Sequence, residues 1–284
     1  MSNAGPNELQ AVYWTAAAGP QWVQQQAMFD HMLGHFGHAA LNALAAQTGD
    51  HIIDIGCGTA TTTLAIADAV GPTGWVVGAD ISSTMIDAAR QRAAQFPNVS
   101  FVVADAQTER IAPADQLADA AFSRFGVMFF ADPVAAFTNI AANVKSDGRL
   151  AFVCWQHEQT NEWISLPAGI MRQFTPEPVL PPPNAPGPFA FHDRDRLRDI
   201  LTSAGWTEVQ IDPFSAPTTM GAGLGLNAAV TQSMSTNAGQ ILRSQVDETT
   251  FAAATEAVRA ALSERMLGGA VTFPGNVWVV TAQR

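Results

Sequence analysis

The sequence predicts an α/β protein in which helices cover both faces of a parallel sheet, a doubly wound, Rossmann-like arrangement. Two observations support this fold class. Five short apolar runs alternate with helix-like segments between residues 51 and 155, and such alternation favours parallel strands joined by crossover helices. The chain of 284 residues is also 48% hydrophobic, which is enough for a substantial core.

The elements follow one another in a regular order. The first fifty residues are expected to be helical, with a break at Gly19-Pro20 and a second helix over 39–46 that stops at Gly49. Strands are expected over 51–55, 75–80, 99–104, 120–125 and 150–155. Helices are expected over 61–70, after an N-cap at Ser82 or Ser83, and after Asp132-Pro133.

The pattern changes after residue 155, where a proline-rich segment begins. A helix over 193–204, a strand over 207–211, a helix over 251–262 and a last strand over 277–281 are expected beyond it. The predicted organisation is therefore a core over 50–156, continued by 191–216 and 269–284. Two insertions, 157–190 and 217–268, are expected to form one lid.

Composition limits the partners. A formal net charge of −11 disfavours nucleic acid and anionic membrane surfaces. No apolar stretch is long enough to cross a bilayer, and no secretory signal precedes the helices. Two cysteines, Cys57 and Cys154, are no disulfide framework, so we expect a reducing, cytoplasmic location. The oligomeric state stays open, with a homodimer as one option.

The most informative segment is Asp-Ile-Gly-Cys-Gly-Thr over residues 54–59, a strand followed by a tight turn that opens a helix. Glycines let the backbone approach a ligand, and a helix N-terminus offers unpaired N–H groups. This suits the pyrophosphate of a dinucleotide and also the carboxylate of S-adenosylmethionine (SAM). A plain turn without a ligand is the alternative.

Acidic residues at three strand ends narrow the choice. Asp54 would repel a pyrophosphate but can help to bind the ammonium of a methionine moiety. The third glycine of the nicotinamide pattern is replaced by Thr61. Asp80 can accept from both ribose hydroxyls of SAM, although an acid at this position fits NAD equally well. Asp105 is placed to accept from the adenine amine, or else is solvated, and the Ala106 N–H can reach a ring nitrogen.

Here the sequence resembles class I SAM-dependent methyltransferases. Residues 54–59, 78–82 (Gly-Ala-Asp-Ile-Ser) and 104–106 (Ala-Asp-Ala) are similar to their first three SAM-binding motifs, in order. Residues 123–130, followed by Asp132-Pro133, resemble the branch that includes the ubiquinone/menaquinone-biosynthesis C-methyltransferases, the type 11-like methyltransferases. The likeness is strong over about 50–155.

The resemblance implies a seven-stranded sheet whose last strand is antiparallel, SAM as cofactor, and a small-molecule acceptor. It also implies that residues 1–49 cover the cofactor site. The expected cofactor-binding residues are Asp54, Gly56, Cys57, Gly58, Thr59, Asp80, Ile81, Asp105, Ala106, Phe125, Tyr13 and Trp22. Core packing is the alternative for Phe125, and helix packing is the alternative for Tyr13 and Trp22.

Four histidines are candidates for catalysis or for metal binding. His157 follows the fifth strand near the expected methyl-transfer point, where it would act as a general base or face water on the lid. His31, His35 and His38 share a helical face, but Gly34 and Gly37 are expected to interrupt that helix, and no acid or cysteine completes a ligand set. No metal site is predicted.

The predicted activity is in-line methyl transfer from SAM to O, N or C of a small acceptor under a mainly apolar lid. One alternative is a non-catalytic, regulatory SAM-binding protein. The other is a nicotinamide-dependent oxidoreductase. A short-chain oxidoreductase needs a Tyr-x-x-x-Lys pair, and the only tyrosine and lysine, Tyr13 and Lys145, are far apart.

Overall fold

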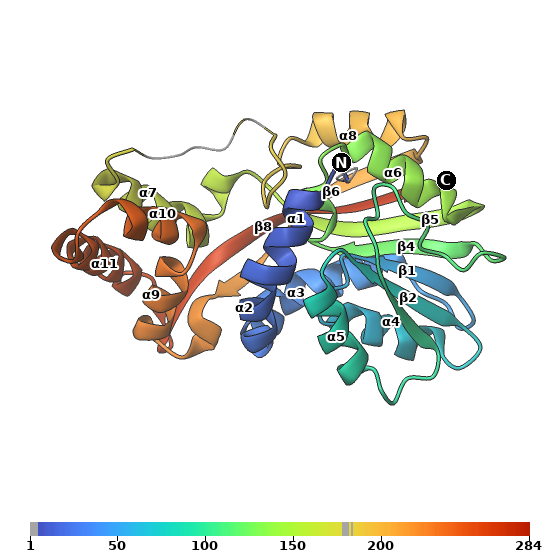
Figure 1. The fold of residues 1–284 in the computed structure, drawn as a ribbon, viewed down its shortest axis with the longest axis horizontal. Helices are drawn as coiled ribbons and strands as arrows, with labels where there is room; N and C mark the ends of the chain where they lie inside the picture. The colour runs from blue at the N-terminus through green and yellow to red at the C-terminus, as the bar shows by residue number, and fades with distance from the viewer. Residues whose placement is uncertain (1–4, 178–181, 183) are drawn as a thin grey trace.

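The fold is a central twisted sheet with helices on both faces and a separate group of helices at one end (Figure 1). The computed structural model describes residues 5–177, 182 and 184–284. The strands are β1 (His51–Ile55), β2 (Trp75–Asp80), β3 (Val99–Val103), β4 (Ala118–Arg124), β5 (Val144–Trp155), β6 (Thr207–Thr219), β7 (Met266–Leu267) and β8 (Ala270–Gln283).

Seven strands lie side by side in the order β3-β2-β1-β4-β5-β8-β6, and the two-residue strand β7 pairs with β8 as an eighth. The first five strands are parallel, whereas β8 is antiparallel to both β5 and β6. The expectation of a mainly parallel sheet with an antiparallel last strand is confirmed. The strand order reverses between β1 and β4, and ligands bind at such a switch point.

Helices pack on each face of the sheet. The first face is covered by α3 (Gln26–Leu44), α4 (Thr61–Val70) and α5 (Ser83–Arg92), and the other by α6 (Pro133–Ala142) and α8 (Arg194–Ser203). The N-caps follow the sequence, since Ser82 accepts a hydrogen bond from the Met85 N–H and Asp132 accepts one from the Ala135 N–H.

The expected interruption of the first long helix is wrong. α3 runs unbroken through Gly34 and Gly37 and ends at Ala45, which has a left-handed φ of 51°, so the stop is not at Gly49. Tertiary packing compensates for the low helix propensity of glycine. Gly37 is buried, and a Cβ there would lie 3.1 Å from Cδ of Arg124. His31, His35 and His38 are exposed on this helix.

The last two long strands extend further than expected. β6 and β8 continue beyond the sheet as a two-stranded ribbon, in which Thr219 pairs with Thr272. On this ribbon lie four helices, here called the helical cap: α7 (Glu162–Phe174), α9 (Leu226–Met234), α10 (Asn237–Gln245) and α11 (Glu248–Ser263). α7 precedes β6 in the sequence, whereas α10 and α11 lie between β6 and β8 in the sequence. α7 packs against both α10 and α11. The helical cap has its own buried apolar cluster.

The N-terminal strap, defined as residues 5–25, lies between the helical cap and the sheet (Figure 1). It consists of α1 (Glu8–Val12), the π-helical turn Tyr13–Ala17 and α2 (Ala18–Gln24). Short 3-10 turns complete the described elements over Val127–Phe129, Glu158–Thr160 and Met220–Gly223. Within the described ranges, no helix has the length and apolar character needed to cross a membrane.

Candidate functional site

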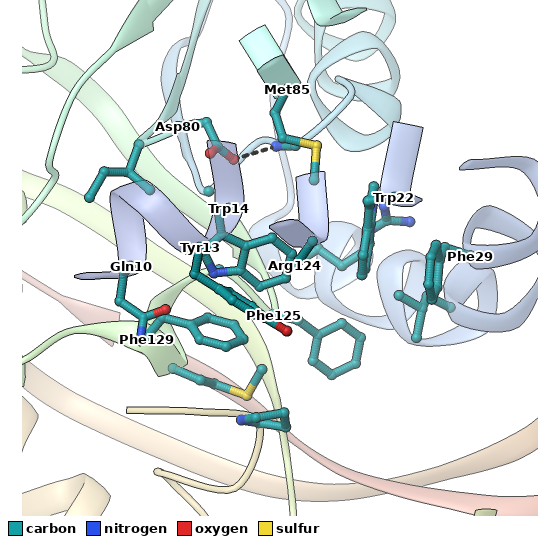
Figure 2. Close-up of a pocket in the computed structure, with 18 of the residues that line it drawn as sticks. Gln10, Tyr13, Trp14, Trp22, Phe29, Asp80, Met85, Arg124, Phe125 and Phe129 are labelled. Atoms are coloured by element: carbon teal, nitrogen blue, oxygen red, sulfur yellow. Dashed lines mark hydrogen bonds between the residues drawn. The ribbon is translucent and has the colours of Figure 1, made fainter. Parts of the chain in front are cut away.

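A cavity of about 380 Å³ lies at the carboxyl ends of β1, β2, β4 and β5, where the strand order reverses. Its size is that of a small-molecule or cofactor site. The N-terminal strap, the strand ends and the helical cap all contribute to its wall. Figure 2 shows Asp80 and Met85 at one end of the cavity, with Tyr13 and Trp14 of the strap between them and Phe125.

The turn between β1 and α4 has the geometry that a ligand-binding loop requires. Gly56 and Gly58 have φ values of +64° and +55°, which glycine adopts without steric cost. The N–H groups of Gly56 and Cys57 both donate to the carbonyl oxygen of Ala79, so the turn is fixed against β2. The first turn of α4 begins immediately behind it, with Ala60 as its left-handed N-cap.

Asp80 joins this turn to the end of β2. One of its carboxylate oxygens accepts from the Gly58 N–H and the other from the Ser82 N–H, each at 2.9 Å. Burial raises the pKa of Asp80, while these two hydrogen bonds act in the opposite direction. The carboxylate therefore lines the cavity in a fixed orientation with acceptor capacity left.

Asp105 lines the cavity beyond the end of β3, and the N-terminal strap contacts it directly. The side-chain amide of Asn7 donates to both Asp105 oxygens and to Oε1 of Gln107. The carbonyl of the same amide accepts from the Ala131 N–H at 2.8 Å. Asn7 is only 4% exposed, so this contact fixes the strap over the strand ends.

Arg124, the last residue of β4, is the one cationic side chain among the described residues that line the cavity. Its Nη2 lies 3.3 Å from Oδ1 of Asp30 on α3. The other oxygen of Asp30 accepts from the Thr61 hydroxyl at 2.8 Å. The Arg124 side chain is 10% exposed, so the ion pair is only weakly screened by solvent.

Aromatic rings form much of the remaining wall. Trp22 and Phe29 stack at a centroid distance of 3.9 Å. At the other side, Phe125 stacks on Trp155 at 4.5 Å, and Trp163 of the helical cap lies 4.9 Å from Trp155. All five line the cavity. Phe125 has a φ of +63°, an unusual conformation for this residue that occurs at functional sites.

Comparison with known proteins identifies the part of the chain that carries the turn and the strand-end acids. The family model described as "Methyltransferase domain" matches residues 52–148. Residues 52–148 are a methyltransferase domain.

Two relatives whose names include a methyltransferase activity match part of this chain. Aklanonic acid methyltransferase DauC of Streptomyces sp. (strain C5) is 36% identical over 107 residues, which cover 37% of this chain and 48% of DauC. Demethylmenaquinone methyltransferase of Paenarthrobacter aurescens (strain TC1) is 25% identical over 60% of this chain and 67% of its own length. This chain therefore matches about half of the length of DauC.

The fold of the whole chain has solved counterparts. The YcgJ protein of Bacillus subtilis superposes with a TM-score of 0.56 at 15% identity, over 89% of this chain and 98% of YcgJ. At that identity the likeness shows the fold and nothing more specific.

Most of the predicted cofactor residues line the cavity at the edge of the methyltransferase domain. Those that do are Gly56, Gly58, Asp80, Ile81, Asp105, Ala106 and Phe125, together with Tyr13 and Trp22 of the N-terminal strap. Parallel topology brings the seven residues at the strand ends together, because successive strand ends lie at the same edge of the sheet. Their contact with a cofactor stays a prediction.

Asp54, Cys57 and Thr59 are not among the lining residues. Asp54 is fully buried beneath the turn, where Thr62 and Thr63 donate to Oδ2 at 3.0 and 2.7 Å. Burial raises its pKa to about 6. Its Oδ1 is buried without a hydrogen-bond partner among the described residues. Direct ligand contact by these three side chains has no geometric support, and a role of Asp54 through water stays a prediction.

His157 also lies outside the cavity. Its exposed ring caps a 3-10 turn by accepting from the Gln159 N–H at 3.1 Å. The ring centroids of His157 and His192 lie 4.8 Å apart in a T-shaped arrangement. The proposed role of His157 as a base has no geometric support. Among the described residues, no group of three or more His, Cys, Asp or Glu side chains could hold a metal ion.

Asn7, Asp30 and Arg124 were not predicted from the sequence. Arg124 carried a signal, because it lies inside the motif over 123–130 that resembles the fourth strand of methyltransferases. Asn7 and Asp30 carried none, since their roles depend on contacts with residues about a hundred positions away.

Proposed function

We propose that this chain binds SAM and transfers its methyl group to a small-molecule acceptor beneath the N-terminal strap and the helical cap. The observation that carries the proposal is the shared cavity: the glycine turn, Asp80 and Asp105 face it from three neighbouring strands of the methyltransferase domain. The names of the two relatives, which refer to small organic acceptors, support it.

The residues present fit the parts of SAM. Asp80 retains acceptor capacity for two ribose hydroxyls, because each oxygen holds only one backbone N–H. The Ala106 N–H and Asp105 suit the adenine ring. Oδ1 of Asp54, which has no hydrogen-bond partner among the described residues, supplies a buried carboxylate oxygen under the turn, which suits the neighbourhood of an ammonium group. SAM, when bound, supplies a methyl group on a positively charged sulfur.

Arg124 is assigned to the carboxylate of the methionine moiety. Its Cδ lies near α3 at Gly37, and its guanidinium reaches Asp30, which is itself bonded to Thr61, the first residue of α4. The guanidinium therefore lies beside the helix N-terminus at the glycine turn. Both features attract an anion, and a guanidinium pairs well with a planar carboxylate.

The protein's main contribution is then alignment in a dry site. The strap and cap contribute wall residues on the sides that the sheet leaves open, including Trp14 and Trp163. Closing the site fixes the acceptor against the methyl group and excludes water that would compete with it. Side chains that hold the strap down are therefore positioning residues for this reaction.

The decisive test is calorimetric titration with SAM, S-adenosylhomocysteine (SAH) and NADH. Wild type is expected to bind both adenosyl ligands and not NADH. Asp80→Ala should lose the adenosyl ligands, with Asp80→Asn as a variant that keeps the shape of the side chain. Asp87→Ala, an exposed acid on α5, is the matched control and should bind as wild type does.

Binding of NADH, or of none of the three ligands, would overturn the proposal. Binding of SAM without methyl transfer to any acceptor would instead favour the regulatory alternative.

A further inference from the structure

The acceptor end of the cavity is the part that lies away from Asp80 and Asp105, beneath the helical cap. Its wall is mainly apolar and aromatic, with Met32, Met128, Phe125, Trp155 and Trp163. The cap adds three uncharged polar side chains, Gln232, Ser235 and Thr236. Rings prefer to stack against other flat π surfaces, so this wall favours a planar apolar molecule.

Among the described residues, no carboxylate, imidazole or amine side chain lines that end of the cavity. The titratable residues among the described lining residues are Tyr13, Asp80, Asp105 and Arg124. Both aspartates lie at the ends of β2 and β3, where the adenosine part of the cofactor is expected. The residues outside the described ranges carry no acidic, basic or histidine side chain.

The two remaining titratable groups do not supply a base either. Tyr13 is 48% exposed on the strap and carries a phenol, which is neither a carboxylate nor an imidazole. The guanidinium of Arg124 has no acceptor atom, and it pairs with Asp30, which Arg92 also contacts. His157, the candidate base in the sequence, lies outside the cavity.

We infer that the acceptor is a flat, mainly apolar molecule with an acidic OH or CH group that is already ionised when it reacts. This inference rests on the proposed function. The proton leaves to water before the site closes. The lone pair of the resulting anion forms the bond to the methyl carbon, the S–C pair stays on sulfur, and the products are the methylated acceptor and neutral SAH.

The charge of the site follows the same logic. Since Arg124 is paired with Asp30 and adjoins the methionine end, the sulfonium of SAM is the positive charge that faces the acceptor. An anionic acceptor should therefore bind more tightly beside a cationic cofactor analogue than beside an uncharged one. Opposite charges a few ångströms apart in a partly buried site are worth about tenfold or more in affinity.

The first experiment uses two flat probes of one skeleton, the acidic enol 4-hydroxycoumarin and coumarin itself. Each is titrated into the protein loaded with SAH, which is uncharged at sulfur, and with sinefungin, which carries an ammonium group in place of the methylated sulfur. We expect 4-hydroxycoumarin to bind about tenfold more tightly with sinefungin than with SAH, and coumarin to show no such difference.

The second experiment measures methyl transfer from SAM by mass spectrometry across a wide pH range. The probes are 4-hydroxycoumarin, 2-naphthol and 2-naphthalenemethanol, in falling order of acidity. The midpoint of the rate should move with the pKa of each probe, and the alcohol should not react. In Tyr13→Phe, the midpoint for each probe should stay at the pKa of that probe.

Each other result would overturn the inference in a recognisable way. One midpoint shared by all probes, or loss of transfer in Tyr13→Phe with SAH binding intact, would assign the proton to a protein base. If 4-hydroxycoumarin binds equally tightly with SAH and with sinefungin, and its binding is lost in Arg124→Gln, then Arg124 and not the cofactor holds the acceptor anion. Failure of every flat probe to bind the SAH-loaded protein would exclude this acceptor class. Failure to bind SAH at all would instead contradict the proposed function.

Discussion

The amide of Asn7 donates to both carboxylate oxygens of Asp105, at 2.9 and 3.1 Å, across 98 positions of sequence. Asp105 was expected to accept from the adenine amine. Like the amide of Asn7, this amine is an NH2 group on a planar carbon atom. In this structure, the amide of Asn7 thus occupies the position expected for the adenine amine. The strap and the adenine compete for the same acceptor atoms, or the strap must shift to admit the ring.

Asn7→Ala is therefore expected to make cofactor entry faster. Hydrogen bonds to a charged group are worth about 1.5–3 kcal/mol, so loss of this contact should raise the association rate of SAH about tenfold or more. Stopped-flow tryptophan fluorescence measures this rate. Glu8→Ala, an exposed position one residue along, is the control. An unchanged association rate in Asn7→Ala would show that the strap does not limit entry.

Arg124→Gln should weaken SAH binding about tenfold to a hundredfold, the usual effect of removing one charge from a buried pair. The same variant should bind 5′-methylthioadenosine, which lacks the amino-acid part, as wild type does. Arg90→Gln, exposed on α5, controls for general loss of a positive charge. Equal weakening of both ligands in Arg124→Gln would mean that Arg124 supports the fold and not the carboxylate.

The two glycines of the turn should respond differently to alanine. A Cβ at Gly56 would lie 2.6 Å from the Gly126 Cα, whereas a Cβ at Gly58 meets no protein atom within 4 Å. Gly56→Ala is thus expected to lose about 3 kcal/mol or more of folding stability. Gly58→Ala should lose about 1 kcal/mol but bind SAH poorly, because its methyl group enters the ligand space. Urea unfolding and calorimetry separate the two effects, and equal stability of both variants would contradict the geometry.

Asp54 should make the protein less stable as pH rises. Its pKa is about 6 in the fold against 3.8 for an ordinary aspartate, so the folded state binds its proton more tightly than the unfolded state does. Its contribution to the free energy of unfolding is therefore fully present below pH 3.8 and falls by about 3 kcal/mol between pH 3.8 and 6.

Asp54→Asn cannot titrate, so the difference in unfolding free energy between wild type and this variant isolates the residue. The unfolding free energy of wild type should fall relative to that of the variant as pH rises from 3.8 to 6, and the difference should stay constant above pH 6. Urea unfolding at a series of pH values gives the curve. Parallel stability curves for the two proteins would show that Asp54 is not in a desolvated environment.

The fold was largely predictable because its signals are local. The apolar runs, the glycine turn and the caps at Ser82 and Asp132 depend on neighbours within a few positions, and β1, β2 and α4 have the predicted bounds. Parallel topology then gathers strand ends at one edge. For that reason Gly56, Gly58, Asp80 and Asp105 line one cavity although they lie at the ends of three separate strands.

The sequence by itself thus determined the fold class, the location of the site and its strand-end acids. Only the tertiary structure decided which way side chains point and which distant partners they meet. It turned Asp54 under the turn and His157 to the surface, and it joined Asn7 to Asp105 and Arg124 to Asp30. The physical reason is that periodicity and turn chemistry act over one or two turns of chain, whereas burial and ion pairing depend on whatever the folded chain brings close.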